Sequence, residues 1–288
     1  MNALQPVHDR HAPASAVRAT EFTFDSADFE RVRELIYRKA GISLSAGKQA
    51  MVYSRLSRRL REVGHSTCAG YLQWLEQLSG AAAEREWQEF VNCLTTNLTS
   101  FFREDHHFPI LADELTRRRT RNLRIWCNAA STGEEPYSIA MTVIEALGPN
   151  ANVQIVCSDI DTKVLATAAK GVYSAEARGL GTERLKKHFL RGSGANDGFV
   201  RVKPELQRLV EFKPFNLMDP KWSLGEPFDI VFCRNVMIYF DGPTQRSVLQ
   251  RMHGAMAQGG LLFAGHSENF ADSKDLFRLR GKTVYERL

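Results

Sequence analysis

No uninterrupted apolar run in this chain of 288 residues approaches the roughly 18 residues that a membrane-spanning helix needs. The first twenty residues likewise lack the apolar core of a signal peptide. We therefore expect a cytoplasmic protein that is not embedded in a membrane. The content of 43% hydrophobic and 25% charged residues is that of a globular protein, which argues against a disordered or fibrous chain.

Signals for disulfides, metals and hydrolases are also missing. The cysteines have no C-x-x-C spacing and their number is odd, so we expect them to be reduced and mostly buried. They are Cys68, Cys93, Cys127, Cys157 and Cys233. His106 and His107 resemble a metal pair, but nothing at helical spacing completes a site, so no metal is predicted. His266 and Ser267 stand without the G-x-S-x-G elbow of hydrolases.

The N-terminal third of the chain has helical periodicity and no paired strands. A tail over residues 1–21 is expected to be disordered, because it contains Ala, His and Pro without periodicity. The stretch SADFERVRELIYRKAG then predicts a helix that is capped by Ser26 and stops at Gly41. A second helix is expected to begin near Gly47, and two more follow it. Residues 22–96 are thus predicted to form a small helical domain.

Beyond residue 120, short apolar runs alternate with helical segments, which is typical of a parallel α/β sheet. The runs are LRIWC, VQIVCSD, LVEFKPF, FDIVFCRN and GLLFAGH. The final FRLRGKTVYERL predicts an antiparallel hairpin, and a turn-rich region with a short FVRV run predicts a small antiparallel β insertion at about residues 172–208. The predicted fold class is therefore α/β, with a doubly wound, mostly parallel sheet formed by residues 97–288.

The first apolar run leads into NAASTGEEPYS at residues 128–138, where a nucleotide-binding fold would have a glycine-rich turn. A dinucleotide site needs G-x-G-x-x-G, because the backbone must approach a pyrophosphate at a helix N-terminus. This turn has one glycine, Gly133, and places Glu134 and Glu135 at the start of the helix. Two carboxylates there would repel a phosphate. The pattern favours a phosphate-free ligand with a cationic or hydroxyl-bearing part.

Asp159 ends the second run, about where an acid binds ribose hydroxyls in such folds. A cationic ligand with a ribose and no phosphate is S-adenosylmethionine, and Asn216 and Leu217 after the third run are placed to contact its adenine. An acid at a strand end is also a common helix cap or turn former, so spacing alone leaves both interpretations open.

Five motifs give a more specific result. NCLTTNLTSFFRE, ASTGEEPYSIA, SDIDTKVL, FDIVFCRNVMIYF and GLLFAGHSENF together resemble the chemotaxis receptor methyltransferases of the CheR family, over residues 22–288. The resemblance implies an S-adenosylmethionine-dependent methyltransferase fold with an N-terminal helical domain and an inserted β subdomain. It also implies methyl transfer to glutamate side-chain carboxylates on the cytoplasmic helices of chemoreceptors, which gives glutamyl methyl esters and S-adenosylhomocysteine.

The resemblance assigns site residues motif by motif. Arg103 and Tyr239 would be catalytic, with Tyr239 facing the transferring methyl group and Arg103 over the methionine end of the cofactor. Asp159 would lie at the ribose. The residues implied to bind the cofactor are Asn97, Thr99, Arg103, Glu134, Asp159, Asn216, Leu217, Arg234 and Asn235.

Positive charge is concentrated in one region of the chain. Residues 31–61 contain nine Lys and Arg against one acid, Glu34, whereas the whole chain has a net charge of only +5. The arginines beside the apolar stripe of the second helix are Arg55, Arg58, Arg59 and Arg61. Because methylated receptor helices are rich in glutamate, these arginines are predicted to dock on them. A solvated helix face is the alternative.

Two other functions fit parts of the pattern. A nucleic-acid methyltransferase would suit a basic helical domain, but no N-P-P-Y tetrad, RNA-binding signature or aromatic interleaving accompanies it, so no nucleic-acid partner is expected. A non-catalytic, cofactor-binding adaptor of a signalling array is the other alternative, and the presence of Arg103 and Tyr239 disfavours it.

The β insertion resembles the family element that binds a receptor's C-terminal tail by adding a strand. A monomer is expected.

Overall fold

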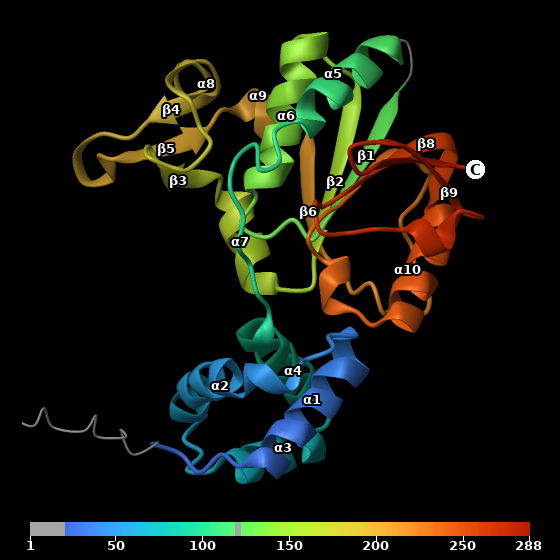
Figure 1. Ribbon diagram of the computed structural model, residues 1–288. Coiled ribbons are helices and arrows are strands. Elements are labelled where there is room, and N and C mark those ends of the chain that lie inside the picture. Colours follow the sequence, from blue (N-terminus) through green and yellow to red (C-terminus); the bar gives the residue numbers. More distant parts are fainter. Residues whose placement is uncertain (1–20, 119–121) are drawn as a thin grey trace, which may run out of the picture.

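The computed structural model describes residues 21–118 and 122–288. The tail predicted over residues 1–21 lies outside this range except for Glu21. A helical part and a part built on a sheet lie one beside the other and are joined by an extended linker (Figure 1). The linker leaves the last N-terminal helix at Thr95 and reaches the sheet part at His107.

The helical part packs its apolar faces into one core. Its elements are α1 (Ser26–Ala40), η1 (Ala46–Lys48), α2 (Gln49–Val63), α3 (Cys68–Gln77) and α4 (Gly80–Leu94). Each of the four α-helices buries apolar side chains in that core. The helix α1 ends before Gly41, as predicted, and Gly41 adopts a left-handed conformation. The N-cap is Asp25 rather than the predicted Ser26, because Asp25 and Asp28 exchange side-chain to backbone hydrogen bonds as a capping box.

Seven strands form one sheet in the order β6-β2-β1-β7-β8-β10-β9. The parallel strands are β1 (Leu123–Asn128), β2 (Val153–Asp159), β6 (Val210–Pro214), β7 (Phe228–Cys233) and β8 (Met256–Ala264). The antiparallel strands are β9 (Phe277–Gly281) and β10 (Val284–Arg287). Every predicted apolar run and the predicted terminal hairpin form strands of this sheet. The doubly wound, mostly parallel fold is therefore confirmed.

Helices cover both faces of the sheet (Figure 1). Those on one face are α5 (His107–Arg117), α6 (Glu134–Leu147) and α7 (Thr162–Lys170), and α10 (Gly242–Ala255) lies on the other. Two apolar cores result, one with Leu111 and Ile139 and one with Val248 and Met252. The helix α5 had no counterpart among the predicted helices.

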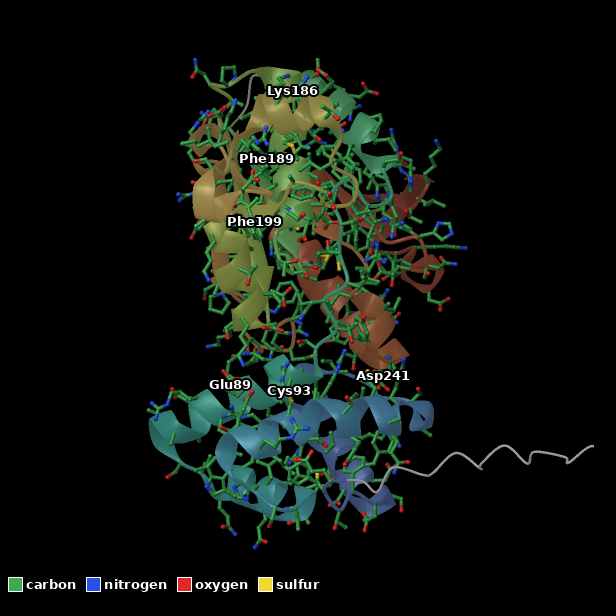
Figure 2. The ribbon with its side chains drawn as sticks, turned by 90° about the vertical axis from the view of Figure 1, so that its left-hand side faces the viewer. Glu89, Cys93, Lys186, Phe189, Phe199 and Asp241 are labelled. Atoms are coloured by element: carbon green, nitrogen blue, oxygen red, sulfur yellow. The ribbon has the colours of Figure 1, made fainter. Side chains whose placement is uncertain are left out.

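A three-stranded antiparallel sheet in the order β3-β5-β4 is inserted between α7 and β6, which confirms the predicted β insertion. Its elements are β3 (Val172–Ser174), α8 (Thr182–His188), β4 (Phe189–Arg191), η2 (Gly194–Asn196), β5 (Phe199–Val202) and α9 (Pro204–Gln207). Figure 2 labels Phe189 and Phe199 in this insertion. Phe189 is buried, with its ring 5.9 Å from that of Phe101, whereas Phe199 is 49% exposed.

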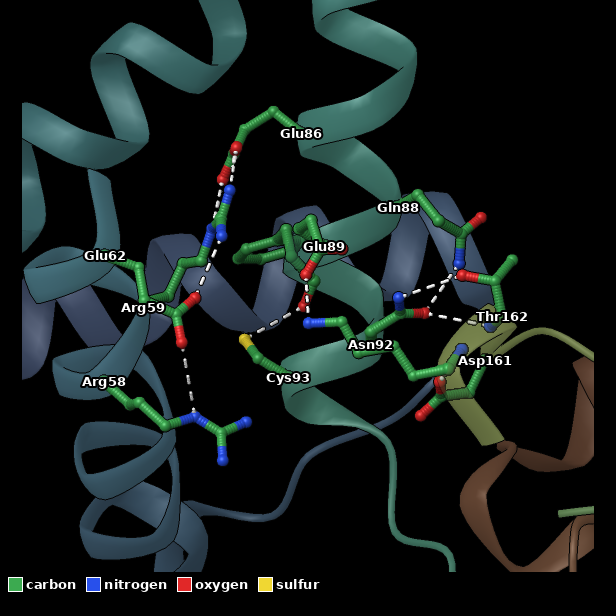
Figure 3. Close-up of polar contacts among 12 residues, drawn as sticks. Arg58, Arg59, Glu62, Glu86, Gln88, Glu89, Asn92, Cys93, Asp161 and Thr162 are labelled. Atoms are coloured by element: carbon green, nitrogen blue, oxygen red, sulfur yellow. Dashed lines mark hydrogen bonds and ion pairs between the residues drawn. The ribbon is translucent and has the colours of Figure 1, made fainter. Parts of the chain in front are cut away.

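Polar side chains join the helical part to the sheet part at α4 and α7 (Figure 3). Gln88 of α4 donates a hydrogen bond of 2.7 Å to the backbone oxygen of Ile160, and Asn92 donates one of 3.1 Å to Thr162 Oγ1. Lys163 of α7 forms an ion pair with a glutamate of α4. These contacts fix the helical part over the carboxyl ends of the strands.

Candidate functional site

A cavity of about 530 Å³ lies at the junction of the helical part and the sheet. Its walls come from residues 40–51, the linker after α4, the carboxyl ends of β1, β2, β6 and β7, and the loop after β7. Ligands of doubly wound sheets bind at this edge, because the loops that follow the parallel strands form a crevice there. The cavity is therefore the candidate site.

The cavity brings together most of the residues that the sequence suggested. Those that line it are Asn97, Thr99, Arg103, Asp159, Asn216, Leu217, Arg234, Asn235 and Tyr239. Glu134 does not line it, and its carboxylate accepts a hydrogen bond of 2.6 Å from Thr132 Oγ1 instead. The adjacent Glu135 lines the cavity, because successive residues of a helix point in different directions. A cofactor role for Glu134 stays a prediction.

Asp159 ties two strand-end loops together at the floor of the cavity. Its Oδ2 accepts from the backbone N–H of Ser131 at 2.8 Å, and its Oδ1 accepts from that of Asp161 at 2.9 Å. Burial raises the pKa of Asp159 to about 6, even though both amide bonds favour the carboxylate form. A pair of hydroxyl donors on a bound ligand would further stabilise the ionised form of the Asp159 carboxylate.

Arg234 is a buried cation at the end of β7. Its side chain is 1% exposed and forms ion pairs with Glu135 of α6 and, at 3.2 Å, with Glu104 of the linker. It also donates to the backbone oxygen of Arg103. A buried charge needs such partners, since an unpaired one would cost several kcal/mol. Arg234 thus holds the linker against the sheet and shapes the wall that Arg103 belongs to.

The linker and the loop after β7 bring the two residues suggested as catalytic to the same cavity. Arg103 Nη1 donates to the backbone oxygen of Leu98 at 2.8 Å. Tyr239 ends η3 (Met237–Tyr239), and its backbone oxygen accepts from the N–H of Ser43 at 2.8 Å. Both residues line the cavity, although they are separated by more than a hundred positions in the sequence.

Asn216 and Leu217 line the cavity beside β6 in different ways. The amide of Asn216 is already engaged, since Nδ2 donates to the backbone oxygen of Lys39 at 2.8 Å and Oδ1 accepts from Met218 at 2.9 Å. Leu217 and Phe215 add apolar surface to the same wall. Asn216 thus connects α1 to the wall, while the apolar pair suits a flat aromatic group.

Sequence reasoning missed Asn128, the last residue of β1. It is 1% exposed and lines the cavity. Apart from the thiol of Cys233, which is a weak acceptor, neither atom of its amide has a protein partner within residues 21–118 and 122–288. A buried amide normally has partners, so Asn128 is poised to bind a polar ligand group. Its position at the head of the NAASTGEEPYS turn was the available signal.

The four arginines of α2 do not form one exposed stripe, and Figure 3 shows two of them, Arg58 and Arg59, with their partners. Arg55 donates to the backbone oxygens of Leu94 and Thr95 at 2.7 and 2.9 Å and lines the cavity. Arg59 is 16% exposed and is paired with the buried Glu86. Arg58 and Arg61 are 67% and 53% exposed, and each pairs with one exposed acid, Glu62 and Glu21 respectively. Only these two present their charge outward.

The two adjacent histidines lie apart from the cavity lining. His107 is buried, and its Nε2 lies 3.0 Å from Thr283 Oγ1. Burial lowers the pKa of His107 to about 4, which keeps its ring neutral. No group of three or more His, Cys, Asp or Glu in the described part of the chain is arranged to hold a metal ion. Among the described helices, none is long and apolar enough to cross a membrane.

Comparison with known proteins gives a consistent result. The family described as CheR methyltransferase, SAM binding domain, matches residues 97–286, and the one described as CheR methyltransferase, all-alpha domain, matches residues 27–95. A chemotaxis protein methyltransferase of Klebsiella aerogenes is 52% identical over 274 residues, which cover 94% of this chain and 93% of the relative. Chemotaxis protein methyltransferase 2 of Pseudomonas aeruginosa is 52% identical, with coverages of 95% and 97%, and the Escherichia coli chemotaxis protein methyltransferase is 51% identical, with coverages of 90% and 90%.

Proposed function

This chain belongs to the CheR family of S-adenosylmethionine-dependent chemotaxis methyltransferases, and on that premise we propose that it methylates glutamate side chains of chemoreceptors. The products would be glutamyl methyl esters and S-adenosylhomocysteine. The observation that carries the proposal is one cavity in which Asp159, Arg103 and Tyr239 meet, although three separate segments supply them. We also propose that residues 22–96 and 97–288 act as two domains with this cavity between them.

The residues of the cavity fit S-adenosylmethionine. Asp159 would accept hydrogen bonds from the ribose hydroxyls, and Leu217 with Phe215 would contact the adenine. Because β1 lies between β2 and β7 in the sheet, a ligand with its ribose at β2 would carry its amino-acid end over β1. There Asn128 presents an amide that lacks strong protein partners among the described residues.

The proposed reaction needs alignment more than proton transfer. When bound, the cofactor supplies a sulfonium methyl group as the electrophile. A glutamate carboxylate, with an ordinary pKa of about 4.3, is already ionised at neutral pH and needs no general base. The protein therefore has to align the carboxylate oxygen with the methyl carbon and exclude water. Tyr239 and Arg103 would position the reactants without donating protons.

Docking of the receptor would use the exposed part of α2. Arg58 and Arg61 present cations to solvent, and their partners Glu62 and Glu21 are about half exposed and easily exchanged for receptor glutamates. A receptor tail peptide could in addition extend the small sheet, whose outer strands are β3 and β4. A chemoreceptor would thus be held at two places, with its cytoplasmic helices on α2 and its tail on the small sheet, and the enzyme would act there as a monomer.

The test is transfer of a radiolabelled methyl group from S-adenosylmethionine to receptor-containing membranes, followed by mild alkali. Label that enters receptor protein and is released as methanol identifies carboxyl methyl esters and supports the proposal. Alkali-stable label would contradict glutamate esterification, and label in added RNA or DNA would favour a nucleic-acid methyltransferase. Binding of S-adenosylhomocysteine without any transfer would favour the adaptor.

A further inference from the structure

Glu268 is a buried acid that lies in the loop after β8 and makes no ion pair among the described residues. It is 4% exposed, and within residues 21–118 and 122–288 its carboxylate accepts hydrogen bonds from backbone N–H groups only. Oε1 accepts from Val236 at 2.9 Å and from Met237 at 2.8 Å, and Oε2 accepts from Asn235 at 3.0 Å and from Gly265. Burial raises the pKa of Glu268, and the four amide donors oppose that rise by stabilising the carboxylate.

Three of these donors belong to the loop that carries Asn235 and Tyr239 into the cavity. Asn235 has a φ of 58°, a left-handed conformation that leaves the next N–H groups pointing in one direction. Consecutive N–H groups of this kind form a concave anion site, and here a side chain of the same chain fills it. The carboxylate of Glu268 therefore fixes the donor side of the loop.

The acceptor side of the same loop is held independently. Gln245 of α10 donates to the backbone oxygens of Met237 and Phe240 at 2.9 and 3.1 Å, and the N–H of Ser43 donates to the backbone oxygen of Tyr239. With its N–H groups on Glu268 and its oxygens on these partners, the loop has little freedom to move. Tyr239 sits at its end.

The loop after β8 approaches the loop after β7 so closely that position 265 must be glycine. A Cβ at Gly265 would lie 2.5 Å from Asn235 Nδ2 and 2.8 Å from both Asn235 N and Glu268 Oε2. Such distances are too short for any real Cβ, and one of the neighbours is backbone. The segment GHSEN thus brings a glycine and an acid together for one task, which is to seat the loop after β7.

We infer that Glu268 is a positioning residue for methyl transfer, acting through the backbone of residues 235–237 to fix Tyr239 at the cavity. The inference rests on the proposed role of Tyr239 at the transferring methyl group. Glu268 lies outside the cavity lining and would not contact either reactant. Its effect should be on the alignment of the reactants, where a misplacement of about 1 Å can lower a rate by up to about 100-fold.

The test compares Glu268→Gln with the full-length wild type. Gln keeps the shape, but its NH₂ group faces backbone donors that need an acceptor, so the loop should shift. Faster amide hydrogen exchange is expected at residues 235–237, with a fall in kcat of roughly 10- to 100-fold. The KM for receptor and the Kd of S-adenosylhomocysteine should change much less than kcat. Glu268→Asp, which keeps the charge, should show a smaller fall.

The decisive measurement is a double-variant cycle with Tyr239→Ala. If Glu268 acts through Tyr239, adding Glu268→Gln to Tyr239→Ala should cost almost no further kcat. Multiplicative losses, or exchange rates unchanged from wild type, would overturn the inference. A control is Glu114→Gln, which loosens a buried acid of α5 that pairs with Arg117 and Arg118. An equal fall in kcat there would show that Glu268 acts through general stability.

Failure of the proposed function would look different from failure of this inference. If the wild type transfers no methyl group to receptors, the acceptor assignment fails while the exchange measurement on residues 235–237 still decides whether Glu268 holds the loop. If the loop is held but kcat is insensitive to Glu268→Gln, the positioning role is wrong and the receptor activity stands.

Discussion

Replacement of Asn128 by Ala should weaken binding of the cofactor product S-adenosylhomocysteine without weakening the fold. The side chain is 1% exposed at the end of β1, faces the cavity and lacks strong protein partners among the described residues. Most buried polar side chains stabilise the folded state through the partners they have, and their loss destabilises it. Asn128 makes almost no such interaction in the free protein, so its replacement should lower the affinity for the ligand without lowering the stability of the fold.

The magnitude follows from the groups that the amide would meet. The amino-acid end of the ligand carries an ammonium and a carboxylate, and a hydrogen bond to a charged group contributes about 1.5–3 kcal/mol. Every 1.4 kcal/mol is about tenfold in Kd, so Asn128→Ala should raise the Kd about 10- to 150-fold. The melting temperature of the free protein should stay the same or rise.

Calorimetric titration with two ligands makes the prediction specific. Methylthioadenosine has the adenine and ribose of S-adenosylhomocysteine but no amino-acid end, so its Kd should be unchanged in Asn128→Ala. Asn122→Ala is a matched control, because this exposed asparagine precedes the opposite end of the same strand. Equal losses of affinity for both ligands would refute a contact with the amino-acid end, and an unchanged Kd for S-adenosylhomocysteine would refute any contact.

Other perturbations test the rest of the site. The pKa of Asp159 is raised to about 6, so this carboxylate becomes protonated in the free protein as the pH falls through 6. The Kd of S-adenosylhomocysteine should therefore rise between pH 7 and 5 in wild type but not in Asp159→Asn. Parallel pH curves for the two proteins would exclude a contact between this carboxylate and the ligand. Tyr239→Phe should lower the plateau of the pH–rate profile, whereas a shifted pKa in that profile would indicate proton transfer. Charge reversal at Arg58 and Arg61 should raise the KM for receptor at low salt and leave the Kd of S-adenosylhomocysteine unchanged; an unaltered KM counts against docking on α2. Arg103→Ala should raise the KM for S-adenosylmethionine more than it lowers kcat, and the reverse would place Arg103 at the acceptor.

Residues at strand ends could be predicted from the sequence because parallel strands bring their carboxyl ends to one edge. Asp159 and Arg234 end two apolar runs, and once the runs are read as parallel strands their proximity follows from the sheet order. Tyr239 follows one of those strands by a few residues. Local pattern suggested a ligand role for Asp159, whereas the roles of Arg234 and Tyr239 were implied by the family resemblance and the fold accounts only for their place at this edge.

Pairing between distant segments could not be read in the same way. Arg58 and Arg59 are neighbours on one basic helix, yet one is 67% exposed and the other is held by Glu86 of α4. Helical periodicity gives the direction of a side chain but not the element that packs against it. Glu268 likewise depends on N–H groups that are 31 to 33 positions away in the sequence. These N–H groups point toward one carboxylate because Asn235 of the loop has a left-handed backbone conformation.

The charges around the cavity agree with a reaction that destroys charge. In the proposed transfer, a carboxylate and a sulfonium become a neutral ester and a neutral thioether, so a cation that bound the acceptor carboxylate tightly would stabilise the ground state more than the transition state. Arg234 avoids this problem, because Glu104 and Glu135 already neutralise it. Arg103 forms no ion pair within the described part of the chain and still lines the cavity. The carboxylate at the amino-acid end of S-adenosylmethionine keeps its charge throughout the reaction, so Arg103 can bind it without raising the barrier. The proposed reaction thus favours the cofactor over the acceptor as the partner of Arg103.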